Sequence, residues 1–319
     1  MARNVSVAFV IALFGSGVAL AGDPPGQAAE QVEVRLAVKA GDTFRFRQTE
    51  ASSTEVDGKP YKAEESAQEY SVAVKSVRPD GGLDVALTFD AIRAKLLDRG
   101  TGAWTELDTS KPLPEGSAMK AQAMDALSRA MVGRPIAVTL DAHGVPTAVS
   151  GLRDAVSAGI KGTPFEQMLP VDKIFTDADG MKLVADLFAG APAGPHAVGA
   201  KWSGEAEDEV SSQSLDFTAE WTLTAATADD ATVTSKLTWK PGKEAFSDGA
   251  KPVGGGDATT KFSRKDGLVL SMKKHLEANR DTGAMKATSH TDSTIERLPA
   301  KAAEPAKPAD PKKPDPSKK

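Results

Sequence analysis

Apolar and polar residues alternate along most of the chain, the pattern of β-strands with one buried face. In the first half this predicts strands over residues 32–38, 43–50, 69–77, 83–92 and 103–107, and a hairpin of 136–140 with 145–149. In the second half it predicts strands over 217–223, 233–239, 259–263, 268–276 and 284–297. Pro79-Asp80-Gly81-Gly82 predicts a tight turn, since glycine readily adopts the positive φ that such turns need. Val56-Asp57-Gly58-Lys59-Pro60 predicts another.

The period changes to that of a helix at Ser117. The helical stripe there comprises Met119, Ala123, Leu127, Ala130 and Met131, and Asp125 and Arg129 are spaced for an ion pair one turn apart. Residues 151–190 are also predicted to be helical. Thr163-Pro164-Phe165-Glu166 is typical of a capping box, and Asp179 would cap a later helix through Met181, Val184, Ala185 and Phe188. We expect a polar, mobile loop over 241–257, with Gly254, Gly255 and Gly256 inside it.

The two β-rich halves share an order of elements. Each opens on Gly-x-x-aromatic, at Gly41 and at Gly199, and continues with two alternating strands and a glycine-turn hairpin. This order predicts a duplicated unit. The expected fold class is α+β, with a large curved antiparallel sheet, an incomplete barrel of duplicated β halves, and helices packed on one face. One domain is expected over 32–298, divided into a β half (32–150), a helical middle (151–190) and a second β half (198–298).

Both ends of the chain differ from this domain. Residues 1–21 have Arg3 before an apolar stretch and end in Ala19-Leu20-Ala21, which predicts a cleaved signal peptide and hence a periplasmic or secreted bacterial protein with no transmembrane anchor after cleavage. Residues 22–31 are expected to be a linker. Residues 299–319 are rich in proline and lysine and lack large apolar residues, so we expect a disordered tail. The tail is either a plain solvated end or a basic spacer that contacts anionic envelope components.

Composition excludes several classes of protein. The chain has no cysteine, which excludes disulfides, thiolate catalysis and cysteine-ligated metals. A formal net charge of −5 gives no support to a nucleic-acid partner.

Motifs that would carry chemistry are weak. Ser117 and Lys120 match S-x-x-K, but the companion motifs of penicillin-interacting hydrolases are missing, so chance or helix capping explains the match. The histidines, His143, His196, His275 and His290, have no recognised metal-ligand spacing. Asp177 and Asp179 lack the spacing of a calcium loop. We therefore predict no catalytic, cofactor-binding or metal-binding residues and no cofactor.

Trp202, Trp221 and Trp239 all fall on predicted strands of the second half. They either pack in the core or line a groove for an apolar or sugar ligand.

Several short motifs resemble an uncharacterised family of secreted bacterial proteins, a domain of unknown function. They are Gly-Asp-x-Phe at residue 41, Val-x-x-Val-x-Pro-Asp-Gly-Gly over 74–82, Leu-Asp-x-x-Gly-Val over 140–145, Val-Gly-x-x-Trp over 198–202 and Thr-Ile-Glu-Arg-Leu over 294–298. The order of elements is also similar to the LolA and LolB type of periplasmic lipoprotein carrier. That resemblance implies acyl chains held between a curved sheet and its helices.

The function that follows is a non-catalytic envelope protein that binds a lipid or other apolar ligand between sheet and helices. A structural or protein-interaction component of the envelope is the alternative, and a hydrolase of unrecognised type is the third.

Overall fold

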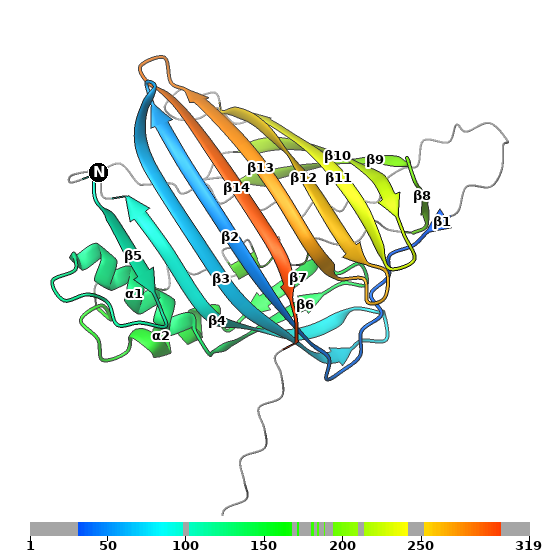
Figure 1. Cartoon of the computed structure of the whole chain (residues 1–319), viewed down its shortest axis with the longest axis horizontal. Coiled ribbons are helices and arrows are strands. Elements are labelled where there is room, and N and C mark those ends of the chain that lie inside the picture. Colours follow the sequence, from blue (N-terminus) through cyan, green and yellow to red (C-terminus); the bar gives the residue numbers. More distant parts are fainter. Residues whose placement is uncertain are drawn as a thin grey trace, which may run out of the picture.

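The computed structural model describes residues 31–97, 102–167, 171, 180–181, 184, 188, 194–209, 214–241 and 252–300. Most of these residues lie in one twelve-stranded sheet whose ladders are antiparallel (Figure 1). The strands of the first half are β2 (Thr43–Val56), β3 (Lys59–Val77), β4 (Leu83–Leu97), β5 (Trp104–Asp108), β6 (Pro135–Leu140) and β7 (Pro146–Ser150). Those of the second half are β9 (Lys201–Glu209), β10 (Ser214–Ala226), β11 (Asp230–Pro241), β12 (Val253–Ser263), β13 (Val269–Asp281) and β14 (Lys286–Leu298).

The described strands pair as hairpins with two exceptions. Their order is β7-β6-β4-β3-β2-β14-β13-β12-β11-β10-β9, and β5 pairs with β4 outside this path. One exception is β4 with β6, which have β5 and α1 between them in the chain and place Leu83 opposite Leu140. The other is β2 with β14, where Arg45 is opposite Leu298 and Val56 is opposite Ala287. Among the described strands, β7 and β9 end the path, so the sheet is curved but not closed. A separate two-stranded ladder joins β1 (Gln31–Val32) to β8 (His196–Ala197).

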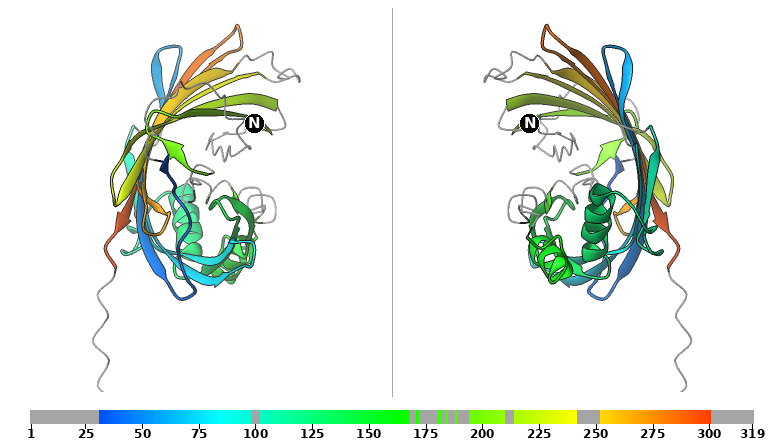
Figure 2. Two further views of the ribbon diagram at one scale, coloured as in Figure 1. Left: turned by 90° about the vertical axis from the view of Figure 1, so that its right-hand side faces the viewer. Right: turned by 90° about the vertical axis from the view of Figure 1, so that its left-hand side faces the viewer.

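Two complete helices are described, α1 (Met119–Met131) and α2 (Leu152–Ile160). They pack against each other, α1 also packs on β4 and β5, and α2 packs on β6. Both helices lie within the concave side of the curved sheet (Figure 2). The large curved antiparallel sheet is thus as predicted, but the protein is mostly β rather than evenly α+β in its described part. Duplication of the β halves stays a prediction. Neither helix is long and apolar enough to cross a membrane, and no other helix of the described residues is.

The core lies between the concave face and these helices. Phe46, Tyr70 and Phe89, on β2, β3 and β4, are almost completely buried, and their rings meet at 5.7 Å and 6.2 Å between centroids. The same cluster continues into the second half through Ile295, Met272 and other apolar side chains of β10 to β14. One core therefore crosses the junction between β2 and β14.

The β2–β14 junction also carries side-chain contacts of its own. The hydroxyls of Thr49 and Thr294 are 2.6 Å apart, and those of Thr54 and Ser289 are 3.0 Å apart. The guanidinium of Arg297 lies 4.6 Å from the centre of the Phe44 ring, within the range of a cation–π contact.

The predicted strand over 32–38 is wrong beyond Val32, because only Gln31 and Val32 join a ladder. Val34 is buried, and the backbone amide of Ala37 donates to the Asp266 carbonyl at 3.1 Å. The segment is therefore held by packing and single hydrogen bonds against the β12–β13 turn. The alternation of apolar and polar residues in this segment therefore reflects side chains that pack on the core, although the backbone joins no strand ladder beyond Val32.

The predicted loop over 241–257 is also wrong at its end, since β12 begins at Val253 and includes all three glycines. A Cβ at Gly254 would lie 2.2 Å from the Trp239 ring, and one at Gly256 would lie 2.1 Å from the His275 carbonyl. Glycine is needed here for close packing inside a strand, not for a loop.

The helix starts were predicted imprecisely. The first helix begins at Met119 after Ala118, not at Ser117, and Met119 is 63% exposed. The predicted pair is confirmed, with Arg129 Nε 2.7 Å from Asp125 Oδ2. Residues 163–167 form turns, and Glu166 accepts a hydrogen bond from the Gly162 amide at 2.8 Å.

Three further predictions concern segments that lie partly or wholly outside the described residues. Gly180, Met181 and Val184 are helical, in line with the later predicted helix, whereas its predicted cap, Asp179, lies outside the described residues. Residues 1–30 and the tail from 301 also lie outside them.

We predict that Ile295→Ala lowers the free energy of unfolding by about 2–5 kcal/mol, because Ile295 is fully buried at the β2–β14 junction and its loss leaves a cavity. Urea unfolding followed by circular dichroism measures this. Val77→Ala is the control, since Val77 is 46% exposed at a strand end, and it should change stability by no more than about 0.5 kcal/mol. Equal effects of the two substitutions would contradict a core that crosses the junction.

Candidate functional site

The two faces of the sheet differ in chemistry because side chains alternate along each strand. The concave face carries the core and, in the second half, Leu223, Trp221, Phe217 and Trp239. The convex face carries charges, such as Arg47 on β2, Glu69 on β3 and Arg93 on β4, which form ion pairs across neighbouring strands. Among the described residues, the concave side of the sheet is therefore mainly apolar and the convex side is mainly charged.

Aromatic rings cluster on the concave face of β9, β10 and β11. Trp202 lies opposite Trp221, with centroids 6.4 Å apart and planes within 11° of parallel, and His196 stacks on Trp202 at 4.7 Å. Trp239 lies opposite Phe217 and both are buried, whereas Trp202 and Trp221 are only partly buried. We call Trp202, Trp221 and His196 the aromatic platform. All three tryptophans thus lie on strands, as predicted, and share one face.

Glycines on the neighbouring strands make room for two of these rings. A Cβ added at Gly204 would lie 3.3 Å from the Trp221 ring, and one at Gly254 would lie 2.2 Å from Trp239. Each ring therefore reaches over a glycine of the adjacent strand, where a larger residue would leave no room for it.

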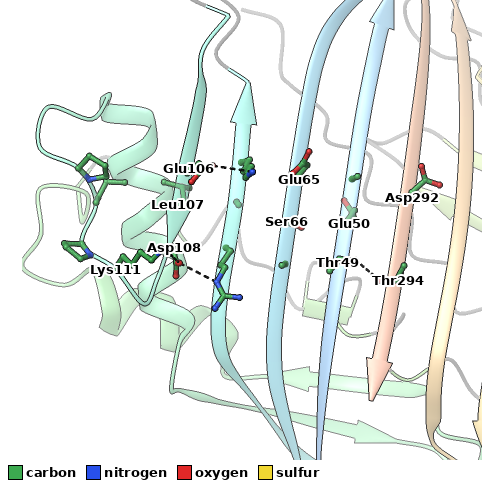
Figure 3. Close-up of a pocket in the computed structure, with 18 residues that line it drawn as sticks. Thr49, Glu50, Glu65, Ser66, Glu106, Leu107, Asp108, Lys111, Asp292 and Thr294 are labelled. Carbon is green, nitrogen blue, oxygen red and sulfur yellow. Dashed lines mark hydrogen bonds and ion pairs between the residues drawn. The ribbon is translucent and has the colours of Figure 1, made fainter. Parts of the chain in front are cut away.

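A pocket of about 700 Å³ lies across β5, β4, β3, β2 and β14 (Figure 3). Most of its lining belongs to two cross-strand rows and to the loop after β5. One row is Asp292, Ala51, Glu65, Lys95 and Glu106, the other is Thr294, Thr49, Ala67, Arg93 and Asp108, and the loop contributes Lys111, Pro112, Leu113 and Pro114. Each row contains one alanine, Ala51 in the first and Ala67 in the second, which leaves space between longer side chains.

The charged groups of this pocket are largely paired. Lys95 Nζ lies 3.4 Å from Glu106 Oε1, and both Arg93 Nε and Lys111 Nζ lie 3.5 Å from Asp108 Oδ2 (Figure 3). Hydrogen bonds from the hydroxyl and amide of Ser110, with smaller contributions from Arg93 and Lys111, lower the pKa of Asp108 to about 2. Because the Asp108 carboxylate stays ionised, it can hold the neighbouring cations and the Ser110 turn in place, but it cannot exchange protons near neutral pH.

The predicted motif residues have ordinary contacts. The Ser117 hydroxyl donates to the Pro114 carbonyl at 2.6 Å and does not cap the helix, because the N-cap is Ala118. His143 lies in an exposed turn, where its amide donates to Asp141 Oδ1 at 2.8 Å. Asp177 and Asp179 lie outside the described residues.

One grouping was missed from the sequence. His275 on β13 and His290 on β14 lie side by side on the convex face, with ring centroids 6.4 Å apart. The hydrogen bond to Asp292, with weaker effects of Asp257 and Glu277, raises the pKa of His275 despite partial desolvation. The sequence pattern that could have indicated this group is His-x-Glu on one strand of a hairpin and His-x-Asp on the next strand.

Comparisons with known proteins give no relative by sequence. No family model matches the chain, and no curated protein matches it. Among solved structures, the β domain of the Bordetella autotransporter BrkA matches at 10% identity and a TM-score of 0.23, covering 80% of this chain and 98% of that one. Salmonella typhi OmpF in complex with daunomycin matches at 8% identity and a TM-score of 0.23, covering 82% of this chain and 99% of that one. The translocator domain of NalP from Neisseria meningitidis matches at 7% identity and a TM-score of 0.21, covering 82% of this chain and 90% of that one.

These findings correct the resemblance drawn from short motifs. The similarity to a secreted domain of unknown function and to LolA and LolB carriers is wrong, because no family model matches the chain. The motifs that suggested it, such as Pro-Asp-Gly-Gly, are turn signals that many β proteins share. At these TM-scores the solved structures carry no argument about function either.

We predict that Gly254→Ala lowers the free energy of unfolding by about 1–3 kcal/mol, because the new methyl group overlaps the buried Trp239 ring. Gly204→Ala is the matched control, since its Cβ would meet a partly exposed ring at 3.3 Å and should cost less. Thermal unfolding with near-ultraviolet circular dichroism reports both stability and ring environment. A larger loss for Gly204→Ala would contradict this account of the ring packing.

We predict that Asp108→Asn destabilises the protein by about 1.5 kcal/mol at pH 7, because hydrogen bonds and cations favour the carboxylate. Its folded pKa of about 2 is below the unfolded value of about 3.9, so this stabilisation is present above pH ~4 and is lost as the pH falls toward 2. Urea unfolding at pH 7 and pH 3 should show the difference shrinking at the lower pH. Glu106→Gln, at a 71% exposed side chain, should change stability little at either pH.

Proposed function

We propose that this chain is a non-catalytic protein of the bacterial envelope that binds an apolar or amphipathic ligand against the concave face of its sheet. The observation that carries the proposal is the aromatic platform, where Trp202 and Trp221 are stacked on the concave face and remain partly exposed. Two adjacent, partly exposed tryptophans on one face form an apolar patch, and contiguous apolar patches are common at ligand-binding sites.

The platform suits a ligand with an apolar body and a polar end. The two nearly parallel indole rings provide an apolar surface on neighbouring strands, and apolar contact contributes about 25 cal/mol for each Å² removed from water. His196 stacks on Trp202 and brings ring nitrogens to the same group. Since β9 and β10 hold the tryptophans in register, binding requires little reordering of the protein.

Placement in the envelope rests on the predicted signal peptide over 1–21. The absence of catalysis is proposed from the site itself. The pocket across β5 to β14 holds ion-paired side chains, and the lowered pKa of Asp108 keeps that carboxylate ionised, so it cannot serve as an acid near neutral pH.

The test has two stages. Native mass spectrometry on the mature protein, purified from its own envelope without detergent, asks whether a stoichiometric adduct extracts as a lipid. Calorimetric titration with oleate and with a short-chain phospholipid then measures affinity. We expect saturable binding that Trp221→Ala weakens about tenfold, a change of about 1.4 kcal/mol for one lost ring.

The matched control is Trp104→Ala. Trp104 is 47% exposed on β5, beyond β2 and β14 from the platform, so its loss should leave affinity unchanged. A clean protein mass with no uptake of either lipid would overturn the ligand-binding proposal. A structural or protein-interaction role in the envelope would then be the better explanation.

A further inference from the structure

The convex face carries a group of nitrogen and oxygen donors at the β13–β14 hairpin. His275 and Glu277 lie two residues apart on β13 and therefore on the same face, and His290 lies directly opposite Glu277 on β14. One donor atom from each of these three side chains lies within 4.8 Å of the other two. From these donors we propose that His275, Glu277 and His290 form a binding site for a divalent transition-metal ion of the Zn²⁺ class.

The distances fit such an ion after small side-chain rotations. Zinc binds imidazole nitrogen and carboxylate oxygen at about 2.0–2.2 Å in a tetrahedral arrangement, which places ligand atoms roughly 3.3 Å from one another. His290 Nδ1 is already 3.9 Å from Glu277 Oε2, and the two imidazole planes are within 26° of parallel. All three side chains are partly exposed, so the rings can rotate and a water molecule can complete the fourth position.

Neighbouring side chains orient two of the three ligands. Asp292 Oδ1 lies 2.8 Å from His275 Nδ1, which fixes a proton on that nitrogen and leaves Nε2 for the metal. Asn279 donates to Glu277 Oε1 at 2.9 Å, so the other oxygen of Glu277 faces His290. A carboxylate behind a metal-binding histidine is a common outer-shell arrangement and raises the basicity of the ring.

The local charge also favours a cation. Asp257 on β12 is opposite His275, Asp292 flanks it on the other side, and Glu277 is in the site itself. The opposing charges near the site on this face include Lys273, two residues from His275 on β13, and Lys236, which lies opposite Asp257 on β11. Two imidazoles among three carboxylates give a donor set that suits zinc, nickel or copper better than Mg²⁺ or Ca²⁺, which prefer oxygen ligands alone.

The experiment uses the full secreted chain without any histidine tag. Calorimetry with Zn²⁺ at pH 7.5 should show one equivalent bound, and Co²⁺ should give the visible absorption of a tetrahedral or five-coordinate ion. His275→Ala and His290→Ala should each weaken Zn²⁺ binding at least tenfold, and Glu277→Gln should weaken it by a smaller factor. Binding should persist in 5 mM Mg²⁺, roughly a thousandfold excess over protein.

His143→Ala is the matched control, because His143 is an exposed histidine in a turn away from this hairpin. It should bind Zn²⁺ as the unchanged protein does. Circular dichroism of each variant separates loss of ligands from loss of fold, and the partial exposure of the three side chains predicts folded variants. Unchanged stoichiometric binding in the His275→Ala, His290→Ala double variant, or no saturable binding by the unchanged protein, would overturn the proposal. Because the site is on the convex face, neither result depends on whether a lipid binds the concave face.

Discussion

The pairing of β2 with β14 is the constraint on which the rest of the structure depends. This pairing joins residues 45–56 to residues 287–298, whereas β4 with β6 joins residues 83–88 to 135–140 and the remaining described pairings are hairpins. It makes one core out of two sets of hairpins, with Ile295 and Phe46 on its inner face. It also continues the charged convex surface from one half to the other, because register across the junction fixes which side chains face outward.

Because side chains alternate between the two faces along each strand, apolar and charged groups lie on opposite sides of the same sheet. On β13, Met272 and Leu276 are buried on the concave side while His275 and Glu277 point to the convex side. The aromatic platform and the three donor side chains can therefore coexist without competing for the same surface. Each is held by a ladder of backbone hydrogen bonds, which keeps its geometry independent of what the other face binds.

Local interactions could be read from the sequence and long-range ones could not. The turns at Asp57-Gly58 and Asp80-Gly81 are confirmed with positive φ at Asp57, Gly58 and Gly81, because turn geometry is decided by the residues in the turn. No local sequence pattern in residues 43–56 or 286–298 indicates that these two segments pair, so the central pairing was not predicted. Glycines 254–256 were misassigned for the same reason, since the Trp239 ring that requires Gly254 comes from another strand.

The candidate sites follow the same division. The tryptophans could be placed on strands from alternation alone, but their shared face and the stacking of Trp202 on Trp221 depend on register between β9 and β10. His275 and His290 are fifteen positions apart in the chain and become neighbours only through the β13–β14 ladder. A search for close spacing along the sequence misses donors of this kind.

The β2–β14 pairing has a consequence for the kinetics of folding. Contacts between residues separated by some 240 positions raise the contact order. Chains with such contacts fold slowly, because closing the long loop costs conformational entropy before the stabilising contacts form. Until β14 has paired with it, β2 has no partner on one side, and its row of backbone amides and carbonyls is open to other chains. Protection of this edge therefore waits for the strand furthest along the described part of the chain, and a folding intermediate that lacks β14 exposes an edge to aggregation.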